Sequence, residues 1–193
     1  TTSWRRTLFK PEGIFPALVT PFTDDGKAVD EERLRDLVNH CIELGVHGVV
    51  PCGTTGEFVN MTTEEKQFTI ETVVDEVNGR VKVVAGTGTS GTDQAVEMTK
   101  YAKDAGADAV LIVTPFYLKP ADRGIYEHYD TIASQVEIPI VLYNIPQCTG
   151  LPLPWQMVED LAQIPNIVGV KDSSGQLSFI LAVLEKVRDK INV

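Results

Sequence analysis

The sequence predicts an α/β fold in which short parallel strands alternate with longer helices. Six short apolar runs rich in β-branched residues recur along the 193 residues, and stretches with helical spacing lie between them. The runs are apolar throughout rather than alternating with polar residues, which is typical of parallel strands covered by helices on both faces. This alternation predicts a parallel sheet, either open and doubly wound or closed as a (β/α)8 barrel.

The strands and helices are expected in a regular order. We predict strands at residues 14–19, 46–50, 81–85, 109–113, 138–143 and 167–170. Apolar residues spaced as in a helix follow the first, second and last of these strands, beginning at Leu34, Ile70 and Leu177. Asp30 precedes the first of these helices as an N-cap, and Thr62 with Glu65 forms a capping-box pattern before the second. Helix ends are expected at Gly45, Gly79 and Gly106.

Two architectures fit this order. Residues 86–91 have the GxGxxG spacing of a dinucleotide-binding loop, but no acidic residue ends a later strand in the expected ribose-binding context. A barrel instead takes its chemistry from the C-terminal ends of several strands, where the unusual residues of this chain lie. We therefore predict an α/β (β/α)8 TIM barrel, of which residues 1–193 carry about the first six βα units as a single domain, incomplete at its C-terminal end. Residues 191–193 would begin a seventh strand, and the first and sixth strands would be open edges unless another chain covers them.

Composition narrows the possible partners. The hydrophobic content of 43% is that of a soluble globular protein, and no apolar run has the length of a membrane span. The net charge of −10 argues against binding to nucleic acid or to an anionic membrane. The three cysteines are odd in number and far apart, which favours reduced thiols in a cytoplasm, and no clustered His or Cys residues indicate a metal. We interpret the scattered histidines as surface or packing residues: His40, His47 and His128.

One lysine stands in an unusual place. Residues 167–175, IVGVKDSSG, put Lys171 at the C-terminal end of a short apolar strand, just before a turn of small residues. Burial of an unpaired lysine costs several kcal/mol, so its position there needs a reason. Either its stem packs on the strand while its head reaches water, or an apolar surround favours the neutral amine, which can then attack a carbonyl.

Other strand ends carry groups that would complement such a nucleophile. Gly53, Thr54 and Thr55 follow the second strand and offer backbone N–H and hydroxyl donors to a carboxylate, unless they form only a turn and a helix cap. Tyr117 follows the fourth strand in an aromatic loop that suits an interface as well as a site. Tyr143 ends the fifth strand, where its phenol is either a proton relay or a packed core group. Together these residues provide the groups that an imine-forming enzyme needs. Such an enzyme requires neither a metal nor an organic cofactor.

The same segments resemble a known family, the dihydrodipicolinate synthase/N-acetylneuraminate lyase superfamily. The similarity rests on GIFPALVTPF at 13–22, GTTGE at 53–57, TPFY at 114–117, YNIP at 143–146 and GVKDSSG at 169–175, and it extends from about Gly13 to Val193. It implies a (β/α)8 barrel, a class I aldolase mechanism without a cofactor, and usually a homotetramer built as a dimer of dimers.

The resemblance also implies a role for each site residue. Lys171 would form a Schiff base with pyruvate or another 2-oxo acid, and Tyr143 would relay protons. Thr54 and Thr55 would bind the pyruvyl carboxylate in the loop that begins at Gly53, with Thr55 also taking part in the relay. Tyr117 would reach across the dimer interface to complete the relay of the neighbouring subunit.

The substrate prediction depends on one departure from the family pattern. The synthases usually carry an arginine two residues after the proline of the YNIP-like motif, where it holds the carboxylate of the second substrate. This chain has Cys148 there, and a thiol does not replace a bidentate cation. We therefore expect an aldolase that cleaves a 2-keto-3-deoxy sugar acid and releases pyruvate. The alternative is a 4-hydroxy-tetrahydrodipicolinate synthase, which condenses pyruvate with aspartate semialdehyde; sialic acid lyases come third. A barrel that binds a small anion without turnover is the non-enzyme alternative.

Overall fold

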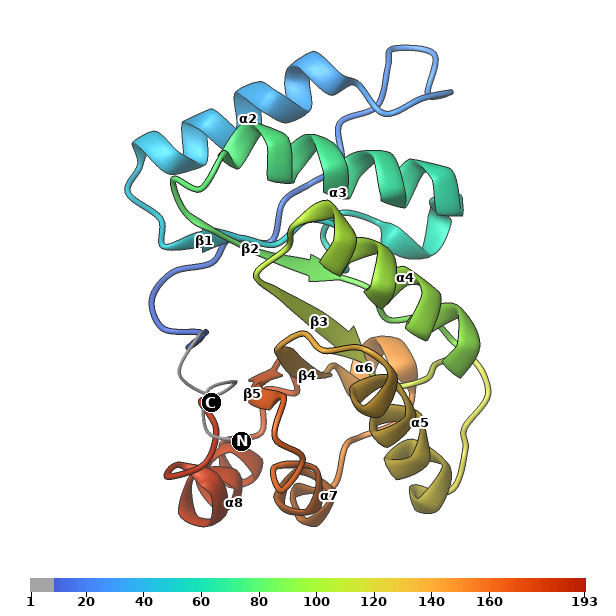
Figure 1. Cartoon of the computed structure of the whole chain (residues 1–193). Coiled ribbons are helices and arrows are strands. Elements are labelled where there is room, and N and C mark those ends of the chain that lie inside the picture. The colour runs from blue at the N-terminus through green and yellow to red at the C-terminus, as the bar shows by residue number, and fades with distance from the viewer. Residues whose placement is uncertain (1–8) are drawn as a thin grey trace. The chain divides into compact units, whose positions relative to one another are not determined.

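The computed structural model describes residues 9–193 (Figure 1). These residues divide into two compact units. The N-terminal unit consists of Glu12–Thr87 and Lys100–Val110. The C-terminal unit consists of Gly88–Thr99 and Leu111–Val193, together with the described residues that precede Glu12. The assignment of residues 1–193 to a single domain stays a prediction.

The strands and helices alternate as the sequence predicts. The predicted strands from the second to the sixth correspond to β1 (Gly48–Val49), β2 (Lys82–Gly86), β3 (Ala109–Val113), β4 (Ile140–Asn144) and β5 (Ile167–Asp172), which are neighbours in chain order. The helices are α2 (Glu31–Glu43), α3 (Thr63–Val77), α4 (Thr92–Ala105), α5 (Asp122–Gln135), α6 (Pro146–Thr149), α7 (Trp155–Leu161) and α8 (Leu177–Val187), with a 3-10 turn at Phe58–Asn60. None of the helices in the described part of the chain combines the length and the apolar character that are needed to cross a membrane.

Local sequence signals fix the helix ends in the N-terminal unit. The side chain of Asp30 accepts a hydrogen bond from the N–H of Arg33 and caps α2, while Thr62 and Glu65 form the complete capping box of α3. Left-handed glycines follow α2, α3 and α4, as predicted, at Gly45 (φ 81°), Gly79 (φ 73°) and Gly106 (φ 101°). These predictions from the sequence are confirmed.

The first predicted strand, at residues 14–19, is only partly formed. Ala17 pairs with Val50 in a single parallel bridge, the N–H of Leu18 donates to the Val50 carbonyl at 3.0 Å, and the N–H of Val50 donates to the Pro16 carbonyl at 3.0 Å. The segment therefore runs beside the end of β1 without becoming a regular strand. Proline contributes to this, because Pro16 has no N–H to donate to a ladder.

In the C-terminal unit, β4 and β5 pair in parallel, and every residue of β4 is buried. The chain then returns to the free side of β5 at its last residues. Asn192 forms a parallel bridge with Gly169; its N–H donates to the Val168 carbonyl at 3.0 Å, and its carbonyl accepts from the N–H of Val170 at 2.9 Å. Residues 191–193 thus begin to pair as a seventh strand would. The prediction that the sixth strand is an open edge is therefore wrong at Val168–Val170. A single extended residue, Asn192, is enough to pair with the backbone there.

Candidate active site

Lys171 and Tyr143 are neighbours at the C-terminal ends of β5 and β4. The two residues face each other in the register of the parallel pair, and the Lys171 ammonium lies 4.3 Å from the centre of the Tyr143 ring. Tyr143 is buried and Lys171 is half-buried. An ammonium above a ring face at this distance is attracted to the electrons of the ring. Among the residues that the structure describes, Lys171 makes no ion pair, so its nitrogen remains open to a small molecule.

An irregularity in strand pairing creates this neighbourhood. Ile140 pairs with Ile167, but the next residue, Val141, pairs with Gly169, so Val168 is an extra residue on β5. Had the pairing continued without this bulge, Tyr143 would lie opposite Val170 rather than Lys171. Bulges of this kind re-aim side chains next to functional sites.

A second polar pair lies on the opposite face of the same strands. Asn144 faces Asp172 in register, and its amide nitrogen donates to the Asp172 carboxylate at 2.7 Å. The amide oxygen of Asn144 accepts from the backbone N–H of Leu153 at 3.0 Å. The other carboxylate oxygen of Asp172 accepts from the hydroxyl of Ser174 at 2.8 Å and from its N–H at 3.3 Å. We did not predict roles for Asn144 and Asp172 from the sequence, although each directly follows a predicted site residue.

A cleft of about 370 Å³ opens on this second face. Asn144, Leu153, Trp155, Ser174 and Phe179 contribute to its walls, whereas Lys171 and Tyr143 do not. Among the described residues, no charged side chain lines it. This opening is therefore separate from the lysine.

Cys148 lies in α6, the short helix that follows the Tyr143 strand. Its thiol is exposed, and the preceding residue, Gln147, donates its side-chain amide to the Ser173 carbonyl at 2.6 Å. After α6 the chain turns at Gly150, whose φ is 66°.

A β-carbon at Gly150 would lie 3.4 Å from the ammonium of Lys119, so this lysine extends along the end of α6. Lys119 has no ion-pair partner among residues 9–193.

The predicted carboxylate-binding loop belongs to the N-terminal unit. Gly53 is buried, whereas Thr54 and Thr55 are exposed, and neither threonine hydroxyl makes a hydrogen bond with the described residues. The loop is shaped by a tight turn, in which the N–H of Gly56 donates to the Gly53 carbonyl at 3.0 Å. The Gly56 carbonyl in turn accepts the hydroxyl of Thr20 at 2.7 Å. Two uncommitted hydroxyls on a fixed turn are suited to binding an anion.

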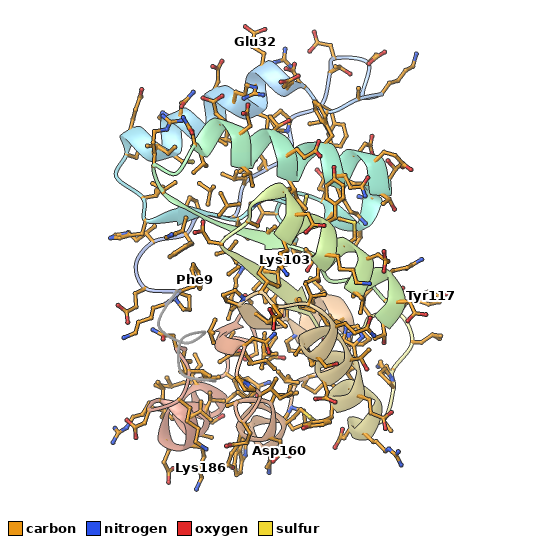
Figure 2. The ribbon with its side chains drawn as sticks, in the orientation of Figure 1. Phe9, Glu32, Lys103, Tyr117, Asp160 and Lys186 are labelled. Atoms are coloured by element: carbon orange, nitrogen blue, oxygen red, sulfur yellow. The ribbon has the colours of Figure 1, made fainter. Side chains whose placement is uncertain are left out.

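Tyr117 is the most exposed of the predicted site residues. It lies in the loop between β3 and α5 with a left-handed backbone (φ 73°), and 92% of its surface is accessible. Figure 2 shows it on the outside of the ribbon. The next residue, Leu118, is 76% exposed. Two adjacent large side chains held out by a strained backbone suit contact with a partner chain, but the role of Tyr117 stays a prediction.

Of the predicted site, the structure therefore brings together Lys171 and Tyr143 in the C-terminal unit and Gly53, Thr54 and Thr55 in the N-terminal unit. No group of three or more His, Cys, Asp or Glu side chains within residues 9–193 is arranged to hold a metal ion. Burial raises the pKa of the Cys52 thiol to about 12 and lowers the pKa of the His128 imidazole to about 4, so both groups are neutral near pH 7.

Comparisons with known proteins agree on one family. The model of the dihydrodipicolinate synthetase family matches residues 10–193. A 4-hydroxy-tetrahydrodipicolinate synthase from Methanopyrus kandleri is 49% identical over 182 residues, which are 94% of this chain and 61% of the relative. The chain thus spans about three fifths of the length of this relative.

Solved structures give the same result. The chloride-inhibited dihydrodipicolinate synthase of Acinetobacter baumannii, solved with pyruvate, superposes with a TM-score of 0.91 at 43% identity, covering 93% of this chain and 62% of that one. YagE, a prophage protein of the dihydrodipicolinic acid synthase family from E. coli K12, was also solved with pyruvate. It superposes with a TM-score of 0.89 at 31% identity, and the match covers 92% of this chain and 59% of YagE. These likenesses confirm the predicted fold class, the TIM barrel, of which this chain carries only a part.

Proposed function

The chain belongs to the dihydrodipicolinate synthetase family, and from this premise we propose that it is part of a pyruvate-dependent class I aldolase with its Schiff base on Lys171. The observation that carries the proposal is the Lys171 ammonium 4.3 Å from the ring of Tyr143 at the adjacent strand end. Pyruvate in two solved relatives supports a 2-oxo acid as the ligand.

The chemistry follows from these groups. The neutral Lys171 amine attacks the C2 carbonyl of pyruvate, the carbonyl oxygen takes up two protons and leaves as water, and the nitrogen remains bonded to C2 as an imine. Loss of a proton from C3 gives an enamine, which adds to an aldehyde; the reverse sequence cleaves the carbon–carbon bond. Tyr143 carries protons in both directions. Thr54 and Thr55 hold the pyruvyl carboxylate, and Thr55 also takes part in the proton relay. In a dimer of dimers, Tyr117 completes the proton relay of a neighbouring subunit.

For the second substrate, the relatives favour 4-hydroxy-tetrahydrodipicolinate synthase over the sugar-acid aldolase that Cys148 led us to expect. We propose the synthase reaction, the condensation of pyruvate with aspartate semialdehyde, as the activity of the complete protein. The ammonium of Lys119 has no ion-pair partner among residues 9–193 and lies near the end of the helix that carries Cys148, so it is a cation available for the second carboxylate. Sugar-acid cleavage remains the second candidate, because the exposed thiol at Cys148 is neutral and suits a hydroxylated substrate. A cytoplasmic location stays a prediction.

Borohydride trapping tests the mechanism directly. Incubation of the full natural polypeptide with pyruvate and borohydride should reduce the imine and leave a stable three-carbon adduct on Lys171, found by peptide mass spectrometry. A sample without pyruvate is the control. A protein that binds pyruvate but never forms the adduct would be a small-anion-binding barrel rather than an aldolase.

The substrate class is tested by a comparison of kcat/KM. We expect the condensation of pyruvate with aspartate semialdehyde to exceed the cleavage of a 2-keto-3-deoxy sugar acid, and Lys119→Met to lower the first more than the second. Cys148→Arg should raise the synthase reaction further, by about 10- to 150-fold, because a charged bidentate contact to a carboxylate contributes about 1.5–3 kcal/mol. Cys148→Ser is the neutral control. Faster cleavage of the sugar acid by the unmodified protein would make the second candidate the correct one.

A further inference from the structure

We propose that Asn144 and Asp172 lock the register of β4 and β5 and thereby hold Lys171 beside Tyr143. Asn144 is then a positioning residue for Schiff-base formation, without touching the substrate. The role rests on the proposed function of Lys171, but the lock itself is a property of the two strands.

The need for a lock follows from the composition of the strands. Register in a sheet is usually specified because one face is apolar and the other polar, so that a one-residue slip exposes the apolar set. In β4 and in Ile167–Val170 of β5, every residue is buried on both faces. A slip that removed the bulge would set Val168 opposite Val141 and Gly169 opposite Leu142. The aliphatic side chains discriminate weakly between these two registers, and Gly169 adds a steric preference for the observed one, because a β-carbon in its place would lie 2.9 Å from Pro11 Cγ.

The polar residues at the strand ends discriminate strongly. Asn144 is 1% exposed, and its side chain uses the amide nitrogen for Asp172 and the amide oxygen for the N–H of Leu153. Its backbone carbonyl accepts from the N–H of Ser173 at 2.8 Å. After a one-residue slip Asn144 would lie opposite Lys171, and its amide would lose the Asp172 carboxylate. A buried polar group without a partner is costly, so the observed register is the one that satisfies both side chains.

The lock also bears on the nucleophile. The three described donors to the Asp172 carboxylate are neutral, from Asn144 and Ser174, and they hold it on the face opposite Lys171. An ion pair between this carboxylate and the adjacent ammonium would occupy the nitrogen that has to reach a carbonyl. The register that satisfies Asn144 thus also separates the carboxylate from the reacting nitrogen.

An exchange of the two residues tests the lock. Asn144→Asp sets two carboxylates opposite each other. Asp172→Asn sets two amides opposite each other and replaces one of the two acceptor oxygens used by Asn144 and Ser174 with a donor. Each should slow adduct formation with pyruvate and borohydride by about 10- to 100-fold, because displacement of a reacting group by about 1 Å has that effect. The KM for pyruvate should change less than kcat, since neither residue contacts it. The double variant Asn144→Asp/Asp172→Asn restores an amide–carboxylate pair, and the carboxylate introduced at position 144 still accepts from Leu153, so most of the rate should return.

A matched control separates position from general stability. Asn39 donates its amide to Glu76 at 2.8 Å on helices α2 and α3, so Asn39→Asp breaks an equivalent pair away from the strand ends. It should leave the adduct rate unchanged. Near wild-type adduct formation by Asn144→Asp would overturn the proposal, as would a folded double variant no faster than the single ones. If a single variant does not fold, the rate of adduct formation by the double variant decides.

A second readout distinguishes the lock from the proposed function. If the unmodified protein forms no adduct, the function of Lys171 is wrong while the lock is still measurable. Hydrogen–deuterium exchange in the peptide that contains residues 170–174 should then rise in Asn144→Asp and fall back in the double variant. Unchanged exchange in all variants would show that Asn144 does not hold the register.

Discussion

Replacement of Lys171 by arginine is expected to lower turnover by about 10⁴-fold or more while the fold remains intact. The guanidinium keeps the positive charge and can stack on the Tyr143 ring, but it stays protonated and forms no imine. In other enzymes, removal of a covalent nucleophile lowers kcat by up to about 10⁶-fold. The measurement is steady-state turnover of the full natural polypeptide, together with the borohydride adduct, which should disappear.

A matched control lies in the same unit. Lys186, in the last turn of α8, is exposed and is labelled in Figure 2. Lys186→Arg makes the same chemical change away from the strand ends and should leave turnover as it is. Activity of Lys171→Arg within a few fold of the unmodified protein would place the chemistry on another residue.

Replacement of Tyr143 by phenylalanine is expected to have the second largest effect, a fall of about 10²- to 10⁴-fold in the rate of imine formation. The change removes one oxygen and keeps the ring on which the Lys171 ammonium lies. Binding of pyruvate should therefore persist while proton transfer slows. Single-turnover trapping of the adduct measures this rate separately from binding.

A second tyrosine provides the comparison. The hydroxyl of Tyr129 is buried and donates to the Ile112 carbonyl at 3.1 Å. Tyr129→Phe should lower stability by about 1 kcal/mol or more, because a buried carbonyl loses its donor, but it should leave imine formation unchanged. A loss of less than about threefold in Tyr143→Phe would assign Tyr143 to packing alone.

The sequence predicts those features that depend on local chemistry. Asp30, Thr62 and Glu65 cap helices because their side chains reach N–H groups two or three residues away, and such signals are readable without the fold. The strand at Ala109–Val113 has its predicted bounds because the run is apolar and well bounded. The choice of Lys171 and Tyr143 rests on the same kind of signal, a reactive group at the end of an apolar run.

Features that depend on pairing between segments could not be predicted. The bulge at Val168 does not follow from the apolar pattern, because the residues on both sides of it are buried on both faces. Gly169 beside it is a residue type that is common at bulges, but a single glycine does not specify the register. Asn144 and Asp172 lie just beyond the predicted strand ends, and only the register of the two strands shows that they face each other. The short pairing of residues 14–18 likewise depends on where β1 ends rather than on the apolar character of the run.

The extra residue on β5 has a consequence for protein engineering. A design that transplanted Lys171 and Tyr143 onto a scaffold with regular strands, residue for residue from each strand start, would set the tyrosine opposite the position before the lysine. The two side chains would then emerge on opposite sides of the new sheet, however faithfully the motifs were copied. A successful graft must either copy Val168 as an insertion or move one of the two residues by a single step.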